Sequence, residues 1–269
     1  MSEMDWQATL ERAQRARVAN VVCMKWGDRY GPEWVNRLYG MTQRNTTWTV
    51  CFVCFTDDPH GIRPEVECRP LPKVEFDAES IGKYWPKLGL MQPGVGGLDG
   101  LTLFLDLDIV VIGGLDELLA CPGRFCIIRE WKRPELGFGN SSVVRFLVGD
   151  QAQVLERFYA TPPEVIRETY GSKEQNFLTR AAEGVTFWPA EWCVPFPLVC
   201  LSRNRMLRFF STPRQPSEGK IIVFYGSITP RTAMTGRHEP NKRVGQARRL
   251  SLTRRRFKPA AWIAQYWRE

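Results

Sequence analysis

Short apolar stretches recur along the chain, separated by turn-forming residues and by segments with the periodicity of a helix. Two of them, 18–24 and 48–55, flank the segment 32–44, whose apolar residues share one face of a helix that Pro32 would open. The second stretch ends in the turn-rich sequence TDDPHG (56–61). The order strand, helix, strand predicts a β-α-β unit.

The same alternation continues to residue 225. Further strands are predicted at 101–105, 124–130, 141–146, 185–189 and 220–225, and further helices around 81–91, 151–160 and 173–184. Strands that alternate with helices predict an α/β fold with a mainly parallel sheet and helices on both faces. The length of 269 residues and an apolar fraction of 43% are enough for one large domain with a full core.

Two aspartates interrupt the most apolar part of the chain, LTLFLDLDIVVIGG. An isolated buried charge is costly, so Asp106 and Asp108 must be solvated, paired or metal-bound. In an extended chain residues two apart point to the same side, so we expect both carboxylates on one side and Leu107 in the core. Two carboxylates at a strand end suit Mg²⁺ or Mn²⁺ held jointly with phosphates. The alternative is a solvated turn with capping aspartates.

Cysteine and histidine usage excludes several kinds of site. Most of the eight cysteines are expected to be core thiols, because a chain of this size in a reducing compartment does not need disulfides. Cys51 and Cys54 form a CxxC inside a predicted strand, where their odd spacing puts the sulfurs on opposite faces and disfavours zinc binding. The chain has two histidines, so sites with several histidine ligands are excluded.

The positive charge belongs to the end of the chain. Residues 231–269 contain eleven Lys and Arg against two Glu, whereas residues 1–230 contain 26 basic and 27 acidic side chains. We therefore predict a large α/β domain at 1–230 and a basic, aromatic tail at 231–269. Trp262, Tyr266 and Trp267 recur in the tail at helical spacing. The tail either binds an anionic membrane surface or packs back on the domain.

No apolar run reaches the roughly 18 residues of a membrane span, and the N-terminus lacks the apolar region of a signal peptide. We expect a cytoplasmic protein, with peripheral binding to the inner face of a membrane if the tail contacts lipid. No nucleic-acid partner is expected, because the basic tail matches no known nucleic-acid-binding motif.

The segment LFLDLDIVVIGGLDELL resembles the DxD segment of the glycogenin-like and galactosyltransferase-like (family 8-type) nucleotide-sugar glycosyltransferases, which have a GT-A fold. Four further segments follow in the family's order: VVCMKWGDRYG, YWPKLGL, FGNSSVV and EQNFL. The likeness spans about residues 20–230, and only the DxD segment is specific by itself.

This resemblance implies that Asp106 and Asp108 bind the metal and the nucleotide diphosphate. It places Tyr30 near the base and Lys87 in contact with the donor. The alternatives are that Tyr30 packs on the first helix as a rim residue, and that Lys87 is a solvated lysine on an amphipathic helix.

The resemblance also implies that Asn140 and Ser141 line the sugar pocket and that Glu174 and Gln175 lie near the reacting carbon. We therefore take Gln175, Glu174 and Asn140 as candidate catalytic residues and Ser141 as a donor-binding residue. Alternatively, Asn140 and Ser141 only satisfy a turn, and Glu174 and Gln175 form the polar first turn of a helix.

Two positions depart from the family pattern. Tyr225 stands where these enzymes usually have a metal-binding histidine, and a neutral phenol is a poor ligand for a divalent ion. Glu174 replaces the usual aspartate, and its longer side chain can shift how the acceptor is positioned.

The sequence therefore predicts a glycosyltransferase that moves a sugar from a nucleotide diphosphate donor, a UDP-sugar, to a glycan, lipid or protein acceptor. A bound Mn²⁺ or Mg²⁺ would stabilise the leaving diphosphate. Two alternatives stay open. A nucleotidyltransferase would release pyrophosphate, and a silent nucleotide-sugar- or membrane-binding protein would show no turnover.

Overall fold

The computed structural model describes residues 3–75, 85–171, 173–237 and 257–269. The helices are α1 (Glu3–Ala16), α2 (Pro32–Arg44), α4 (Asp116–Ala120), α5 (Gln153–Ala160), α6 (Pro163–Tyr170), α7 (Glu174–Ala181), α8 (Pro230–Thr235) and α10 (Ile263–Tyr266). The strands are β1 (Val18–Lys25), β2 (Thr49–Thr56), β3 (Glu67–Arg69), β4 (Leu101–Leu105), β5 (Ile109–Val111), β6 (Phe125–Arg129), β7 (Gly139–Leu147), β8 (Val185–Phe187), β9 (Cys193–Pro195) and β10 (Ile221–Val223).

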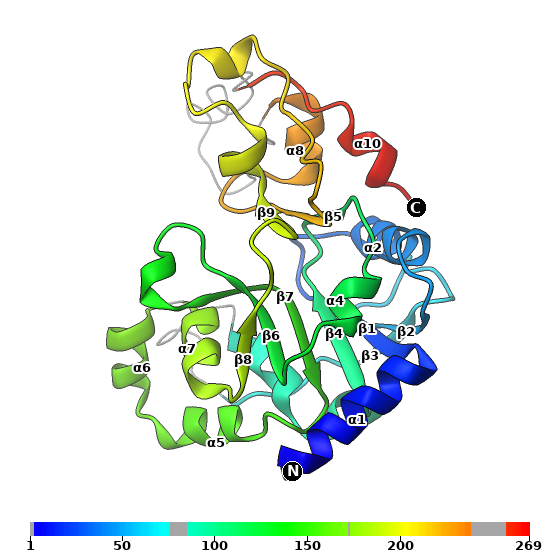
Figure 1. Ribbon diagram of the computed structural model, residues 1–269, viewed down its shortest axis with the longest axis vertical. Helices are drawn as coiled ribbons and strands as arrows, with labels where there is room; N and C mark the ends of the chain where they lie inside the picture. The colour runs from blue at the N-terminus through cyan, green and yellow to red at the C-terminus, as the bar shows by residue number, and fades with distance from the viewer. Residues whose placement is uncertain (1–2, 76–84, 172, 238–256) are drawn as a thin grey trace. The chain divides into compact units, whose positions relative to one another are not determined.

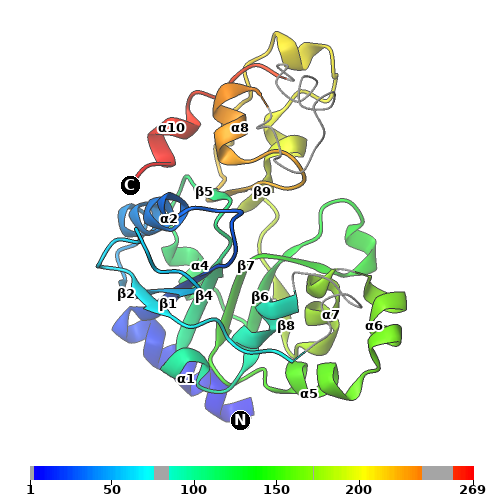
Figure 2. The ribbon, with the colours of Figure 1, turned by 180° about the vertical axis from the view of Figure 1, so that it is seen from behind.

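The chain divides into two compact units (Figures 1 and 2). Unit 1 comprises residues 1–36, 46–107 and 115–190, and unit 2 comprises residues 37–45, 108–114 and 191–269. The predicted boundary between a domain at 1–230 and a tail at 231–269 stays a prediction.

Unit 1 contains a seven-stranded sheet with the strand order β3-β2-β1-β4-β7-β6-β8. Neighbouring strands are parallel except for β7, which is antiparallel to both β4 and β6. The prediction of an α/β fold with a mainly parallel sheet is therefore confirmed. Because β7 runs backwards, its first residues lie beside the carboxyl end of β4.

The two faces of this sheet carry alternate residues of each strand, as the two-residue period of a strand requires. One face, with Val22, Phe55 and Phe104, packs into a large apolar cluster together with α5, α7 and the 3₁₀ helix Trp85–Met91. Helix α1 contacts β1 and β4. It lies in front of the sheet in Figure 1 and behind it in Figure 2, so unit 1 has helices on both faces.

Four features of unit 1 were not predicted or differ from the prediction, and strand β3 is one of them. Helices α1 and α6 were not predicted, although each contributes apolar side chains such as Leu10 and Ile166 to the core. The helix predicted around 81–91 is a 3₁₀ helix at Trp85–Met91, and its first residues lie outside the described part of the chain. Pro86 lacks the N–H that an α-helix interior needs, which fits a short, tighter helix.

Unit 2 contains a three-stranded sheet with the order β5-β10-β9. Helix α10 belongs to this unit, and both Ile263 and Trp267 at the end of the chain are buried. The guanidinium of Arg37 lies 4.1 Å from the centre of the Trp267 ring. Arg44 donates hydrogen bonds to the backbone carbonyls of Tyr266, Arg268 and Glu269. These contacts favour the alternative in which the aromatic end of the chain packs against protein.

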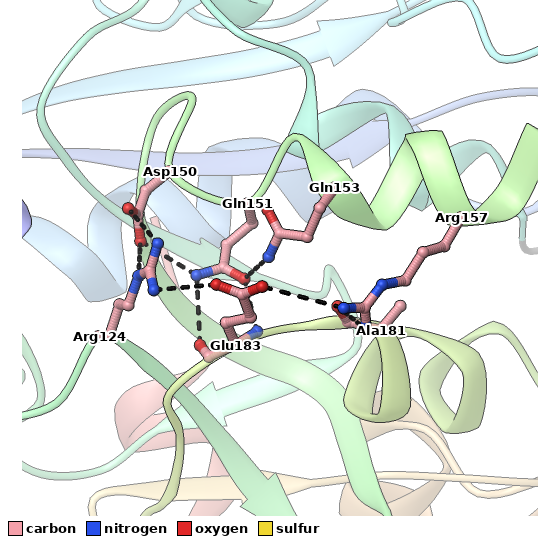
Figure 3. A network of polar contacts seen from close by, with 7 residues as sticks. All are labelled: Arg124, Asp150, Gln151, Gln153, Arg157, Ala181 and Glu183. Atoms are coloured by element: carbon pink, nitrogen blue, oxygen red, sulfur yellow. Dashed lines mark hydrogen bonds and ion pairs between the residues drawn. The ribbon is translucent and has the colours of Figure 1, made fainter. Parts of the chain in front are cut away.

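A polar network ties together the loops at one edge of the unit 1 sheet (Figure 3). Arg124 precedes β6, and its Nε and Nη2 donate to the two carboxylate oxygens of Asp150 at 2.8 and 3.1 Å. The Asp150 side chain is fully buried. Glu183, which precedes β8, forms a second ion pair with Arg124 at 3.1 Å. The network holds β6, β7 and β8 in register at their ends, at the edge opposite to the carboxyl end of β4.

We predict that Asp150→Ala lowers the free energy of unfolding by about 3 kcal/mol, because it leaves a largely buried guanidinium without its main partner. Urea unfolding of the two proteins measures this difference. The matched control is Arg157→Ala, which removes the exposed 3.9 Å pair with Glu183 and a 3.2 Å hydrogen bond to the carbonyl of Ala181, and it should change stability by about 1 kcal/mol or less. Equal effects of the two substitutions would contradict the importance of the buried pair.

Candidate active site

Asp106 follows β4 directly, at the carboxyl end of the strand. Its backbone N–H donates to the carbonyl oxygen of Ser142 at 2.9 Å, which extends the pairing of β4 with β7. Leu107 is buried as predicted, but Leu107 and Asp108 form a turn, so the expected extended Asp106–Asp108 segment is wrong. Asp106 belongs to unit 1 and Asp108 to unit 2.

Lys87 lies beside Asp106, with its side chain 9% exposed. Its Nζ donates to Oδ1 of Asp106 at 2.9 Å and lies 3.8 Å from Oε1 of Glu174. The ammonium also lies 4.9 Å from the centre of the Phe104 ring. The alternative of a solvated lysine on an amphipathic helix is therefore wrong: the 3₁₀ helix directs Lys87 inward, where it neutralises carboxylates.

Ser141 and Glu174 complete this cluster. The Ser141 hydroxyl donates to Oε1 of Glu174 at 2.6 Å and accepts from Nζ of Lys87 at 3.2 Å. Ser141 and Glu174 are both buried. One ammonium faces two carboxylates, so Lys87, Asp106, Ser141 and Glu174 together carry a formal charge of −1. Such a cluster favours an additional cation.

A glycine at the start of β7 allows α7 to approach closely enough to form these contacts. The backbone N–H of Gly139 donates to Oγ1 of Thr179 at 2.9 Å, and this hydroxyl donates to the carbonyl of Gln175 at 2.6 Å. A Cβ on Gly139 would lie 2.6 Å from Cδ1 of Ile127 and 2.8 Å from Thr179. The glycine therefore sets the spacing that lets Glu174 reach Ser141.

Asn140 and Gln175 form a neighbouring pair. The amide of Asn140 donates to Oε1 of Gln175 at 3.3 Å, and its Oδ1 accepts from the backbone N–H of Ser142 at 3.1 Å. Asn140 and Gln175 are half-buried. The structure thus brings four of the predicted site residues into one cluster and two more into an adjacent pair.

Tyr30 lies in the loop after β1 and packs on Trp34, with ring centres 4.6 Å apart. Arg29 lies over its other side, 4.9 Å from the ring centre. This matches the alternative in which Tyr30 packs on the first helix. The two rings also hold the loop that follows β1.

Sequence reasoning missed the residues that fix this loop. Lys25, buried at the end of β1, donates to the carbonyl of Asp58 at 3.0 Å. Oδ2 of Asp57 accepts from the backbone N–H of Gly27 at 3.0 Å. The sequence signal for this contact was a lysine at the end of an apolar strand. These bonds tie the carboxyl ends of β1 and β2 together, at the same edge as Asp106.

The metal expectation rests on the donor set of Asp106 and Asp108. Within the described residues, no three His, Cys, Asp or Glu side chains gather into a metal site. Lys87 engages Oδ1 of Asp106, and the second carboxylate oxygen lies outside this hydrogen bond. Two carboxylates fit Mg²⁺ or Mn²⁺ when phosphates and water supply the other ligands. Tyr225, in place of the expected histidine, follows β10 in unit 2.

An open hollow of about 470 Å³ lies in unit 2 and is lined by residues 112–113, 191–192 and 217–220. None of the candidate site residues lines it. No helix in the described part of the chain is long and apolar enough to cross a membrane.

We predict that Lys87→Met lowers the free energy of unfolding at pH 7 by about 3 kcal/mol, because two carboxylates lose the cation between them. Lys173→Met is the matched control, since Lys173 is exposed just before α7, and it should cost about 0.5 kcal/mol or less. Urea unfolding measures both. A Lys87→Met protein as stable as the control would mean that the ion pairs contribute nothing.

Comparison with known proteins adds evidence on the fold. No family model matches the sequence, and no curated protein matches it. Among solved structures, the bifunctional glycosyltransferase WbbM matches with a TM-score of 0.51 and 17% identity, over 79% of this chain and 46% of WbbM. This chain therefore spans less than half of the WbbM structure.

The galactosyltransferase LgtC, in complex with donor and acceptor sugar analogues, matches with a TM-score of 0.50 and 12% identity, over 87% of this chain and 95% of LgtC. An active-site mutant of LgtC matches with a TM-score of 0.50 and 13% identity. At these identities the likeness establishes the fold. The prediction of a GT-A-like fold is confirmed: this chain has the fold of the glycosyltransferases LgtC and WbbM.

Proposed function

We propose that this protein is a glycosyltransferase that moves a sugar from a nucleotide diphosphate donor, a UDP-sugar, to an acceptor. The observation that carries the proposal is the cluster of Lys87, Asp106, Ser141 and Glu174 at the carboxyl end of β4, in a fold shared with glycosyltransferases. Ligands of open α/β sheets bind at this edge. The cluster's net negative charge suits a divalent cation that accompanies a diphosphate.

In this proposal, Asp106 and Asp108 hold Mn²⁺ or Mg²⁺, which, when bound, neutralises charge on the departing diphosphate. Lys87 has two tasks. It fixes the orientation of Asp106 through the 2.9 Å ion pair, and it supplies a positive charge close to the diphosphate. Because Lys87 is held in place by its partners, little reorganisation is needed when the diphosphate develops charge.

The neighbouring polar residues orient the sugar. Asn140 and Gln175 offer amide donors and acceptors that match sugar hydroxyls, and Gln175 is proposed to lie near the reacting carbon. Glu174 is held by Ser141 and Lys87, so its proposed role is to position them. Tyr30, fixed by Trp34, is proposed to lie near the base, where an aromatic ring can stack.

The proposed acceptor is a glycan, and LgtC was solved with an acceptor sugar analogue. We further propose that the protein acts at the inner, cytoplasmic face of a membrane, bound to anionic lipid. In unit 2, residues 192–217 contain four arginines and no acidic residue. Within this stretch Met206 and Phe210 are 69% and 74% exposed. Exposed apolar side chains among arginines suit an anionic lipid surface, to which residues 231–269 add positive charge.

We predict that Asp106→Asn combined with Asp108→Asn abolishes Mn²⁺-dependent binding of UDP, because the proposed metal ligands lose their charge. Calorimetric titration with UDP, with and without Mn²⁺, measures binding, and circular dichroism checks that the variant is folded. Asp99→Asn is the control, because Asp99 is exposed just before β4, at the opposite end of that strand from Asp106, and this variant should bind like the unchanged protein. Metal-dependent binding that survives in the double variant would contradict the assignment.

The same titration separates the alternatives. Preference for ATP or CTP over UDP, with release of pyrophosphate, would favour a nucleotidyltransferase. Binding of UDP that metal does not change, without turnover of any UDP-sugar, would favour a silent binding protein, for which Tyr225 is the strongest argument.

We predict that Met206→Ser combined with Phe210→Ser weakens binding to phosphatidylglycerol vesicles about ten-fold, because both side chains lose apolar burial in lipid. Vesicle co-sedimentation measures this. The control is Tyr159→Ser with Val165→Ser, which removes exposed apolar side chains from unit 1. Equal binding by all three proteins would refute the membrane surface. Truncation after residue 230 is a poorer test, because it removes Ile263 and Trp267 from the core of unit 2.

A further inference from the structure

Arg145 on β7 is a buried cation without a carboxylate partner among the described residues. Its side chain is fully buried, and its Nε and Nη1 have no hydrogen-bond partner. Its Nη2 donates to the carbonyl of Gly123 at 2.5 Å and to Sγ of Cys126 at 2.8 Å. An unpaired buried charge is costly, so the guanidinium needs an anion. The contacting group that can become one is the thiol of Cys126.

The fold fixes this contact through the sheet. Cys126 on β6 lies directly opposite Arg145 on β7, and opposite Thr186 of β8 on its other side. Gly123 makes room for the sulfur, since a Cβ there would lie 3.0 Å from Sγ of Cys126 and 2.6 Å from Oγ1 of Thr186.

A second thiol stands next to the first. Cys121 lies five positions earlier, in the loop CPGRFC, and is half-buried. The sulfurs of Cys121 and Cys126 lie 3.5 and 4.0 Å from the same carbonyl oxygen, that of Pro122. Cys121, Cys126 and Arg145 therefore form a dithiol with a fixed cation.

We propose that Cys121 and Cys126 form a modification site that a hydroperoxide oxidises to a disulfide. The Cys126 thiolate attacks one oxygen of hydrogen peroxide, the O–O bond breaks, and hydroxide leaves, which gives a sulfenic acid on Cys126. The Cys121 sulfur then attacks the Cys126 sulfur, and its proton leaves with the sulfenic hydroxyl as water. The two thiols are oxidised by two electrons, and the peroxide is reduced.

The electrostatics of the two thiols agree with these roles. The neighbouring Cys121 thiol, together with the charge of Arg145 and against the effect of burial, lowers the pKa of Cys126 to about 7. The Cys126 sulfur, together with burial, raises the pKa of Cys121. For Cys193 and Cys200, burial is the largest effect and raises the pKa of both thiols. A lowered pKa favours the thiolate, which is the reactive form of a cysteine.

The other charged groups at this edge of the sheet are already paired with one another. Arg124, which follows Gly123, is bound to Asp150 and Glu183. Thr186 on β8 carries no charge. Arg145 is therefore the cation that acts on Cys126. A disulfide would remove the Cys126 thiolate that balances the charge of Arg145, so oxidation should also weaken the pairing of β6 with β7.

The test treats the full chain with hydrogen peroxide, blocks remaining thiols with N-ethylmaleimide after denaturation, and maps the cysteines by peptide mass spectrometry. We expect Cys121 and Cys126 to disappear together as a disulfide. In Cys121→Ser, dimedone should trap a sulfenic acid on Cys126. Cys68→Ser, which removes an exposed thiol outside the pair, is the matched control and should still form the disulfide.

The pH profile of disulfide formation tests the role of Arg145. A thiol with a pKa near 7 gains about two-fold in thiolate between pH 7 and pH 9, whereas an ordinary thiol gains about 25-fold. We expect the two-fold rise in the unchanged protein and the steeper rise in Arg145→Lys or Arg145→Met. The proposal is overturned if no Cys121–Cys126 disulfide forms, or if the unchanged protein shows the steep rise. The pH profile of the unchanged protein can be measured even if neither Arg145 variant folds.

Discussion

The ion pairs of Lys87 determine how the candidate active site is arranged. The Lys87 ammonium lies between the carboxylates of Asp106 and Glu174. The Lys87 side chain is largely buried, with 9% of its surface exposed. Without it, two buried or half-buried carboxylates would repel each other at the sheet edge. With it, β4, β7 and α7 can each bring a polar residue to one point. The remaining formal charge of −1 favours an additional cation at this point.

The fold and the position of Asp106 could be predicted from the sequence, because both depend on local patterns. Alternating apolar stretches define strands, and a carboxylate after such a strand lies at its carboxyl end. The burial of Lys87 could not be predicted, since it depends on a 3₁₀ helix and on contacts with residues 19 and 87 positions away. The turn at Leu107 was missed because the apolar run on both sides favoured an extended chain.

Strand β7 links the two polar sites of unit 1. Its first residues, Asn140 and Ser141, belong to the candidate active site, and Arg145 on the same strand holds the Cys126 sulfur. The sequence signal for the second site was an arginine in the apolar strand SSVVRF. Its partner could not be predicted, because the pairing depends on the register between β6 and β7. One antiparallel strand thus positions side chains for two different kinds of chemistry.

We propose that the cluster around Lys87 and Asp106 supports sugar transfer from a nucleotide diphosphate. The decisive experiment is incubation with a panel of UDP-sugars and Mn²⁺, with quantification of free UDP and of pyrophosphate. We expect slow release of UDP from at least one donor, which chelation of the metal stops and a suitable glycan acceptor accelerates. No release of UDP from any donor, or release of pyrophosphate from nucleoside triphosphates instead, would contradict it.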